Sequence, residues 1–341
     1  MRTGAPEGYE PYPPHVLEVD RARSLTRELL RQWGAEESVA GCIADHLVDA
    51  DRAGHPSHGL RRLVSYHRLV QHGEIDIRAV PTVRSRWGAT SMIDAQNGFG
   101  QPAAALAVDS AVADAHIYGV GMAGIVKCGH TGRLGAWSER GAAAGVATLV
   151  VSAGSYPPYE VAAHQHASPA LWTNPISIAI PGSEPPLVLD MATSMIASGK
   201  VEAAIARGDR VPPGVLLRRD GTPTTDPADF LDGGMLLPFG GYKGFGLAVM
   251  VEMLAVGLTG AADEEPASGT LVVCLSPGAF GAEESLGRLV GAVRTRLHDS
   301  ARGQPVIAPG ELEAMSRAAA DVIAVEDETL GLLLSATKGP S

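Results

Sequence analysis

Cysteine is scarce in this 341-residue chain, which contains only Cys42, Cys128 and Cys274. The number is odd and no C-x-x-C pair occurs, so neither a disulfide framework nor a thiol redox motif is expected. Cys42 and Cys274 lie in apolar surroundings, which is typical of buried free thiols. Free thiols fit a reducing compartment, and we expect a cytoplasmic protein.

Long apolar runs and excess basic charge are also missing. No stretch of 18 apolar residues occurs, so no membrane span is expected. Residues 1–14 lack the apolar segment of a signal peptide, and we expect them to form a mobile arm. The 27 Lys and Arg against 38 Asp and Glu give a net charge of −11, which disfavours nucleic acid and anionic membranes as partners. The net charge does not exclude an anionic small substrate, because the local placement of Arg and Lys decides whether one can bind.

Hydrophobic periodicity divides the chain into three parts. Residues 15–78 have helical spacing, and their first helix is predicted to have Asp20 as its N-cap and to stop at Gly34. Residues 79–280 alternate strand-like Val- and Ile-rich segments with Ala-rich helices, and residues 281–341 again read as helices. We therefore predict an α/β fold with a mixed-sheet core, a helical N-terminal layer and C-terminal helices that pack back on the N-terminal part.

Four histidines, His55, His58, His67 and His72, are concentrated in residues 53–73. Ser57 is predicted to cap a helix that runs to about His72. On that helix His58 and His67 would point to opposite sides, so they cannot share a metal ion, and no metal site is predicted. His67 and His72 are expected at the surface.

His58, Arg62 and Tyr66 follow one another at intervals of four, which would place them in one stripe along the predicted helix. Histidine exchanges a proton near neutral pH, and arginine can clamp a carboxylate with two charge-assisted hydrogen bonds. The stripe therefore suits a 2-oxo or 2-hydroxy acid, with Arg62 and Tyr66 as candidate substrate-binding residues. The alternative is a solvated polar helix face. In the first turn of a helix the macrodipole would disfavour a charged His58.

Two glycine-rich stretches resemble nucleotide-binding motifs only superficially. Residues 119–124, GVGMAG, match G-x-G-x-x-G, but a helix-like segment precedes them and a strand-like segment follows. This order is the reverse of a Rossmann fingerprint and predicts a helix-to-strand turn. Residues 240–246, GGYKGFG, have Phe where a phosphate-binding P-loop needs Ser or Thr.

Several longer motifs occur in one order along nearly the whole chain. The stretch DADRAGHPSHGLRRL of residues 49–63 resembles the D-x-R-G-x-x-S-H-G-x-x-R motif of the malate/L-lactate dehydrogenase family that lacks a Rossmann fold. The further motifs are NGFGQPAA (97–104), WTNPIS (172–177), LVLDMATS (187–194), SGKVEAA (198–204), GTPTTDP (221–227), LLPFGGYKGFGLAVMVE (236–252) and APGE (308–311).

The resemblance implies an NAD(P)-dependent oxidoreductase that moves hydride between nicotinamide and C2 of a small 2-oxo or 2-hydroxy acid. It also implies a non-Rossmann nucleotide-binding core and a homodimer. Some branches of the family reduce cyclic imine 2-carboxylates of the piperideine or pyrroline type, which gives the alternative function. The choice between NAD and NADP stays open.

The same resemblance assigns roles to single residues. His58 would be the proton donor or acceptor, oriented by Ser57, and Arg62 would bind the substrate carboxylate. His130 matches the second histidine of the family, and Thr173 would lie near the substrate. The implied cofactor-binding residues are His130, Thr131, Gly132, Arg133, Leu134, Asp190, Met191, Ala192, Gly240 and Lys243.

Two departures from the family pattern bear on the substrate. Thr131 stands where the family usually has Phe, and Lys127, Cys128 and Gly129 replace a more polar run, so the pocket near the nicotinamide is expected to be reshaped. Lys200 resembles the lysine of the hydroxy-acid branches, whereas the imine-reducing branch looks to have Asp there, which favours a carbonyl substrate.

Two functions from other classes remain. A metallohydrolase on the histidine-rich helix is disfavoured by the directions of its histidines. A family member that has lost catalysis and only binds its ligand is disfavoured by the presence of both His58 and Arg62.

Overall fold

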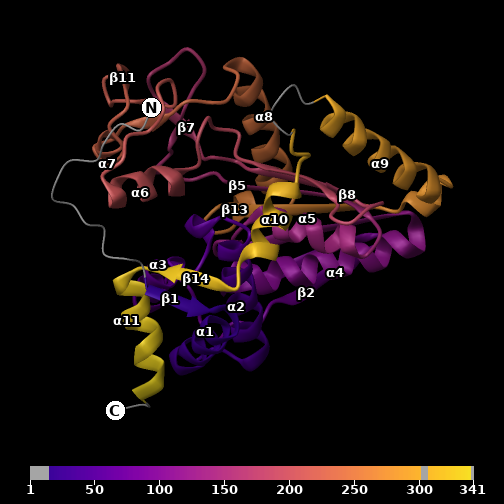
Figure 1. Cartoon of the computed structure of the whole chain (residues 1–341), viewed down its shortest axis with the longest axis horizontal. Coiled ribbons are helices and arrows are strands. Elements are labelled where there is room, and N and C mark those ends of the chain that lie inside the picture. Colours follow the sequence, from indigo (N-terminus) through magenta and orange to yellow (C-terminus); the bar gives the residue numbers. More distant parts are fainter. Residues whose placement is uncertain (1–14, 301–305, 339–341) are drawn as a thin grey trace.

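A computed structural model describes residues 15–300 and 306–338 of the chain (Figure 1). The arm expected for residues 1–14 lies outside the described residues. The described part of the chain has helices toward both its ends, a seven-stranded and a five-stranded sheet between them, and a two-stranded sheet that joins the N-terminal and C-terminal parts. The expected α/β fold with mixed sheets is therefore confirmed.

The N-terminal layer begins with helix α1 (Val19–Trp33). Gly34 ends it with a left-handed backbone, φ 113°, as the sequence predicts, since glycine has no Cβ to oppose that conformation. The N-cap, however, is Glu18 in extended conformation, and Asp20 lies inside the first turn. The predicted cap is therefore two residues late, although an acidic side chain in the first turn still suits the helix dipole.

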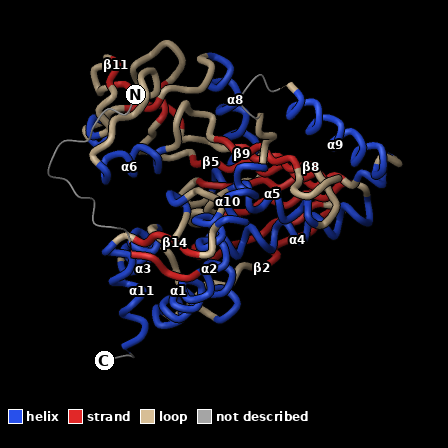
Figure 2. The backbone as a smooth tube through the Cα atoms, in the orientation of Figure 1, coloured by secondary structure: helices blue, strands red, loops and turns tan. Residues whose placement is uncertain are grey.

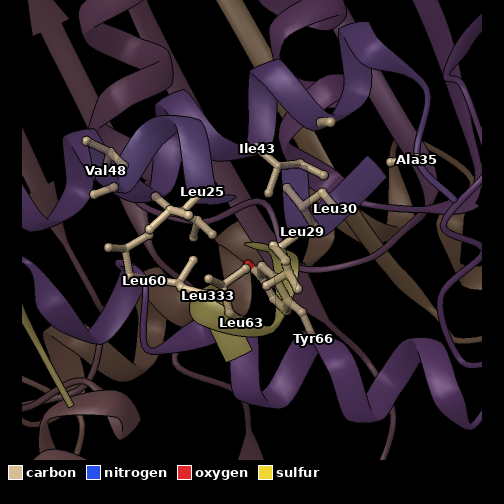
Figure 3. Close-up of a cluster of buried hydrophobic side chains, with 14 of the residues drawn as sticks. Leu25, Leu29, Leu30, Ala35, Ile43, Val48, Leu60, Leu63, Tyr66 and Leu333 are labelled. Atoms are coloured by element: carbon tan, nitrogen blue, oxygen red, sulfur yellow. The ribbon is translucent and has the colours of Figure 1, made fainter. Parts of the chain in front are cut away.

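The N-terminal helices and the C-terminal end of the described chain share one hydrophobic core. Strand β1 (His15–Glu18) pairs antiparallel with β14 (Val322–Val325), and α11 (Asp327–Ser335) packs on α1. Figure 3 shows the side chains that meet there, including Leu29, Leu63 and Leu333, all almost fully buried. The remaining helices of this layer are α2 (Glu37–Arg52) and α3 (Arg62–Gln71).

A seven-stranded sheet forms the centre of the molecule, with strand order β2-β3-β4-β13-β5-β8-β9. The β3–β4 pair is parallel and the other neighbours are antiparallel. The strands are β2 (Thr82–Trp87), β3 (Thr90–Gly98), β4 (Val120–Cys128), β5 (Ala147–Gly154), β8 (Ile176–Ile180), β9 (Leu187–Met191) and β13 (Ser268–Leu275).

Helices cover both faces of this sheet. Helices α4 (Gly100–Tyr118) and α5 (Leu134–Ala143) pack on one face, where they contact alternate strand residues such as Val150 and Val272. The intervening Val151 and Leu271 contact the other face, covered by α8 (Tyr242–Glu252) and the π-helix Met253–Gly257. Successive strand side chains point to opposite faces, which explains the near-continuous apolar runs.

Gly119 confirms the helix-to-strand turn predicted for GVGMAG. It caps α4 with φ 83°, and β4 starts at the next residue. Cys274 is buried as predicted, whereas Cys42 is only half-buried, and no cysteine is in a disulfide among the described residues.

A second, smaller sheet has no counterpart in the sequence-based expectations. Its strand order is β11-β10-β12-β6-β7, and helix α6 (Ser198–Arg207) packs into its apolar core (Figures 1 and 2). The strands are β6 (Val161–Ala162), β7 (Pro169–Leu171), β10 (Leu216–Leu217), β11 (Pro223–Thr224) and β12 (Met235–Leu236), and α7 (Ala228–Leu231) lies nearby.

Two C-terminal helices contact different parts of the fold. Helix α10 (Glu311–Ala319) packs on α2, whereas α9 (Glu283–Asp299) is tied to the β8–β9 loop through Arg294, whose guanidinium donates to the Pro185 carbonyl at 2.6 Å. The domain boundaries expected from the sequence stay predictions. Short 3₁₀ helices occupy Pro56–His58, Ala261–Asp263, Pro277–Phe280 and Ala336–Lys338. Within residues 15–300 and 306–338, no helix has the length and apolarity needed to cross a membrane.

Candidate active site

A cavity of about 400 Å³ opens at one edge of the central sheet. The end of β5, the start of β13 and the loop after β4 meet there, because β13 runs antiparallel to both strands. His58 and His130 both line this cavity, so the structure brings together the two histidines singled out from the sequence. The polar lining residues are His58, Glu74, His130, Thr131, Ser152, Tyr156, Trp172, Thr173, Asn174, Ser268 and Thr270.

His58 is held by a short turn and not by the predicted helix. Pro56–His58 form a 3₁₀ turn, and α3 starts only at Arg62. Ser57 is therefore not a helix cap. Its hydroxyl lies 3.0 Å from Nδ1 of His58, so it does orient that ring, by direct side-chain contact. His58 therefore precedes α3 and does not lie in its first turn, where the sequence placed it.

The late start of α3 also corrects the predicted stripe of three residues. His58 and Arg62 do not lie on one continuous helix, and neither Arg62 nor Tyr66 is part of the cavity lining. Arg62 instead lies beside the turn, where its Nε donates to the Ser57 carbonyl at 2.6 Å. One guanidinium nitrogen is 3.9 Å from a carboxylate oxygen of Glu202 on α6.

Tyr66 is almost fully buried, with 1% of its surface exposed, and lies behind His130. Its hydroxyl is 2.8 Å from Nδ1 of His130 and accepts a hydrogen bond from Nε2 of Gln101 at 2.7 Å. The hydroxyl is thus engaged with protein groups and does not reach the cavity. The expectation that Tyr66 contacts substrate is corrected accordingly.

The rings of His58 and His130 stack on each other, with centroids 5.5 Å apart and planes 26° from parallel. Burial is the main cause that lowers the pKa of His58 from 6.5 to about 3, and the Arg62 guanidinium lowers it further. Burial, and then Arg62, also hold the pKa of His130 well below 6.5. Both rings are therefore neutral at pH 7, and Arg62 acts electrostatically on both.

The expected cofactor-binding segment after β4 divides into two parts. His130, Thr131, Gly132 and Leu134 line the cavity. Arg133 does not, because its guanidinium is buried, with 2% exposed, and forms an ion pair with Glu139 at 2.7 Å. Arg133 anchors this loop within the protein and is not free to hold a cofactor phosphate.

Two side chains fix the backbone of the same loop by accepting hydrogen bonds from its amides. The Arg133 amide donates to Nε2 of His46 at 2.9 Å, and the Gly135 amide donates to a carboxylate oxygen of Asp190 at 2.8 Å. Asp190, which the resemblance assigned to the cofactor, thus anchors the start of α5. Its neighbours Met191 and Ala192 are half-buried and do not line the cavity.

Three other expected residues lie elsewhere. Gly240 lines a separate cavity of about 480 Å³ beside the small sheet, and Lys243 follows it in the first turn of α8. Lys200 lines a third cavity of about 490 Å³, on the side of the Ser57 turn that faces α6. None of the three belongs to the lining around the two histidines.

Thr173 lines the cavity as expected, and its neighbour Asn174 is a site residue that sequence reasoning missed. The Asn174 amide nitrogen donates to the Ala248 carbonyl at 3.0 Å, while Oδ1 is buried without a partner among the described residues. Asn174 also has φ 36°, rare for a residue with a side chain. The sequence signal that could have identified Asn174 is its place in the TNP motif of residues 173–175. Sequence reasoning also missed Gln101, which stood out only as a polar residue in an Ala-rich helix.

His67 and His72 do not line the cavity. His67 packs against Trp33 with ring centroids 4.9 Å apart and planes tilted by 32°, and it is half-buried, which corrects the prediction of a surface position. His72 is exposed, as predicted. No group of three or more His, Cys, Asp or Glu residues in the described part of the chain is arranged to hold a metal ion.

Comparisons with known proteins give the family. The family model described as malate/L-lactate dehydrogenase matches residues 17–333. Hydroxycarboxylate dehydrogenase B of Escherichia coli O157:H7 is 33% identical over 320 residues, covering 89% of this chain and 88% of the relative. A Delta(1)-pyrroline-2-carboxylate/Delta(1)-piperideine-2-carboxylate reductase of Pseudomonas putida is 36% identical over 270 residues, covering 75% of this chain and 78% of the relative.

A solved structure agrees with the sequence comparisons. The structure of a putative malate/lactate dehydrogenase from E. coli superposes with a TM-score of 0.88 at 31% identity, covering 96% of both chains. Ordered motifs, family model and fold thus agree over almost the whole length. The chain belongs to the malate/L-lactate dehydrogenase family and is a dehydrogenase or reductase.

Proposed function

We propose that this enzyme is an NAD(P)-dependent oxidoreductase that transfers hydride between nicotinamide and C2 of a small 2-oxo or 2-hydroxy acid. The observation that carries the proposal is the stacked pair of His58 and His130 in one cavity, beside the Arg62 guanidinium. Reduction at C2 of such an acid needs a proton-exchanging group, a donor to the C2 oxygen and an anchor for the carboxylate. His58 and His130 supply the first two groups from the cavity wall, and Arg62, which lies outside the lining beside the Ser57 turn, has to turn toward the cavity to anchor the carboxylate.

The cavity fits the nicotinamide half of the implied cofactor. Its volume of about 400 Å³ is in the range of small-molecule sites but is too small for a whole dinucleotide. Thr131, Gly132 and Asn174 line it, and the unpartnered Oδ1 of Asn174 is a buried acceptor that suits an amide N–H. When bound, the nicotinamide ring supplies or takes up the hydride.

His58 is the group for proton exchange, held at Nδ1 by Ser57. Its pKa, lowered to about 3, leaves the ring unprotonated at neutral pH, which is the form that can accept a proton from a hydroxy acid. In the reductive direction it must carry a proton. A substrate carboxylate beside Arg62 offsets the positive charge that lowers the pKa of His58, so substrate binding raises that pKa and favours proton uptake.

The alternative substrate is a cyclic imine 2-carboxylate, and the Pseudomonas putida relative named for this activity is the observation that favours it. Lys200, which favoured a carbonyl substrate in the sequence, lines a different cavity from the two histidines. From that position Lys200 does not contact the reacting atoms, so direct contact with Lys200 does not distinguish a carbonyl from an imine substrate.

The proposal is tested by crossing NADH and NADPH with a panel of 2-oxo acids and cyclic imine carboxylates, and following absorbance at 340 nm. We expect turnover with at least one pair, and the pair identifies cofactor and substrate class. Absence of any change across the panel, with binding of neither cofactor, would contradict the proposal. Cofactor binding without turnover would favour the ligand-binding protein, and stoichiometric zinc in the purified protein would favour a metallohydrolase.

We also propose that the enzyme is a homodimer that works in the cytoplasm, which follows the family resemblance and the three free thiols. Sedimentation velocity over a range of protein concentrations tests the dimer. A monomer of 35.3 kDa at all concentrations would contradict it.

A further inference from the structure

Two buried side chains, Gln101 and Tyr66, and the solvent-accessible ring of His130 form a linear chain of hydrogen bonds at the cavity wall. The Gln101 side chain, in the first turn of α4, is completely buried, and its Nε2 donates to the Tyr66 hydroxyl at 2.7 Å. The hydroxyl lies 2.8 Å from Nδ1 of His130. His130 is the only one of the three that lines the cavity. The chain therefore ends on a ring whose other nitrogen, Nε2, lies away from Tyr66.

The chain has a direction, because a phenol carries one proton. Tyr66 accepts from Gln101, so its own proton is free to be donated to Nδ1 of His130. The reverse direction needs the Gln101 amide to be rotated by half a turn, which removes the one hydrogen bond that its nitrogen makes among the described residues. Buried N–H groups without an acceptor are rarer in proteins than under-satisfied oxygens. The orientation with Nε2 of Gln101 on the tyrosine is therefore favoured.

We propose that Gln101 and Tyr66 are positioning residues that fix His130 in the tautomer with its proton on Nε2, so that the ring presents an N–H donor to the cavity. The proposal rests on the proposed function and divides the work between the two histidines. A neutral imidazole that gave up its Nε2 proton would become an imidazolate, so His130 keeps this proton. It hydrogen-bonds the oxygen at C2 of the substrate, which has two lone pairs, while His58 exchanges the proton.

The surroundings of His130 agree with a ring that stays neutral. Desolvation of the ring, and then the Arg62 guanidinium, hold its pKa well below 6.5, and the neighbouring His58 and His46 are neutral at pH 7. The Tyr66 hydroxyl stays protonated, since burial raises its pKa to about 12. A neutral histidine can polarise a carbonyl through a hydrogen bond while it keeps its own proton.

The test is the tautomer of His130, read by ¹⁵N NMR of the full-length protein labelled at histidine, with the His130 signals assigned by their loss in His130→Gln. At pH 7 we expect Nε2 to be protonated and Nδ1 to show the shift of a bare, hydrogen-bonded nitrogen. In Tyr66→Phe and in Gln101→Met, we expect the signals to move toward a mixture of both tautomers. Tyr156→Phe, which alters another tyrosine at the cavity, should leave the His130 signals in place.

Kinetics add a second measurement. With a substrate found in the panel, Tyr66→Phe should lower kcat by roughly tenfold while the Kd for the cofactor changes less than twofold. A wild-type His130 protonated on Nδ1 would overturn the proposal, and so would an unchanged tautomer in both Tyr66→Phe and Gln101→Met. The NMR result needs no turnover, so it can fail or succeed independently of the proposed function.

Discussion

Arg62 has two tasks in the structure, and this changes what its removal should do. Its guanidinium acts electrostatically on both histidines, and its Nε also holds the Ser57 carbonyl at 2.6 Å, one residue before His58. A side chain that only bound the substrate carboxylate would affect KM alone. Because Arg62 also braces the turn that carries His58, we expect both kinetic constants to respond.

We predict that Arg62→Ala lowers kcat/KM at least about tenfold, because hydrogen bonds to charged groups contribute roughly 1.5–3 kcal/mol. KM for the carboxylate substrate should rise and kcat should fall, while the Kd for NADH or NADPH stays within about twofold. Arg61→Ala, at the preceding position, is the control and should behave like wild type. Tenfold weaker cofactor binding with an unchanged KM would show that Arg62 faces the cofactor instead.

At the scale of elements, the loop between β4 and α5 carries the site, and its backbone is tightly enclosed. A Cβ atom on Gly132 would overlap Nε2 of His46, and Gly132 has φ 80°. Gly145 has nearly the same φ, 82°, but a Cβ there would meet nothing within 4 Å. The two glycines therefore separate backbone strain from steric overlap.

We predict that Gly145→Ala costs about 1 kcal/mol of unfolding free energy, from the left-handed backbone alone. Gly132→Ala should cost at least about 2 kcal/mol more, because His46 has to move and release the Arg133 amide. Urea unfolding of both variants measures the difference. Equal losses in the two variants would mean that the loop is free to relax and does not hold His130 rigidly.

The same elements show what the sequence could and could not predict. A strongly periodic segment such as α1 is predicted correctly, because apolar spacing and a glycine stop are local signals. The turn at His58 is not, since the spacing of His58, Arg62 and Tyr66 fits a helix and only the flanking Pro56 and Gly59 hint at a break.

Residues whose partners are distant in sequence are harder still. The family resemblance assigns Arg133 to the cofactor, but the structure pairs it with Glu139 and brings Asp49 within 3.5 Å. Asp190 likewise meets the Gly135 amide 55 residues away. The family motifs locate the two histidines, whereas the part played by Tyr66 depends on where α3 starts, which is a tertiary result.

At the scale of the whole molecule, buried histidines link stability to pH. Burial lowers the pKa of His46 from 6.5 to about 3, as it does for His58, and it lowers that of His130. Each ring is neutral when folded but takes up a proton below pH 6.5 when unfolded, so its contribution to stability is present above pH 6.5 and is lost as the pH falls toward 3. Asp51, with its pKa raised to about 7, acts in the opposite sense, and so do Asp190 and Glu160, whose pKa values burial also raises.

We predict that His46 contributes a fall of up to about 1.4 kcal/mol per pH unit to the unfolding free energy between pH 6.5 and 5, because its ring stays neutral in the folded protein. His46→Gln keeps an acceptor for the Arg133 amide and removes one titrating ring. It should reduce the slope by about 1.4 kcal/mol per pH unit in urea unfolding at pH 6.5, 5.75 and 5. A slope equal to that of the wild type would mean that His46 is protonated in the folded protein.

The central claim is that His58 exchanges the proton of the reaction in the cavity it shares with His130. The most direct measurement is steady-state kinetics of His58→Ala beside His72→Ala, an exposed histidine at the end of α3, with the Kd for the cofactor measured by NADH or NADPH fluorescence. We predict that His58→Ala lowers kcat by roughly 10²–10⁴-fold with little change in cofactor Kd, and that His72→Ala matches wild type. A His58→Ala enzyme with wild-type kcat would contradict the account.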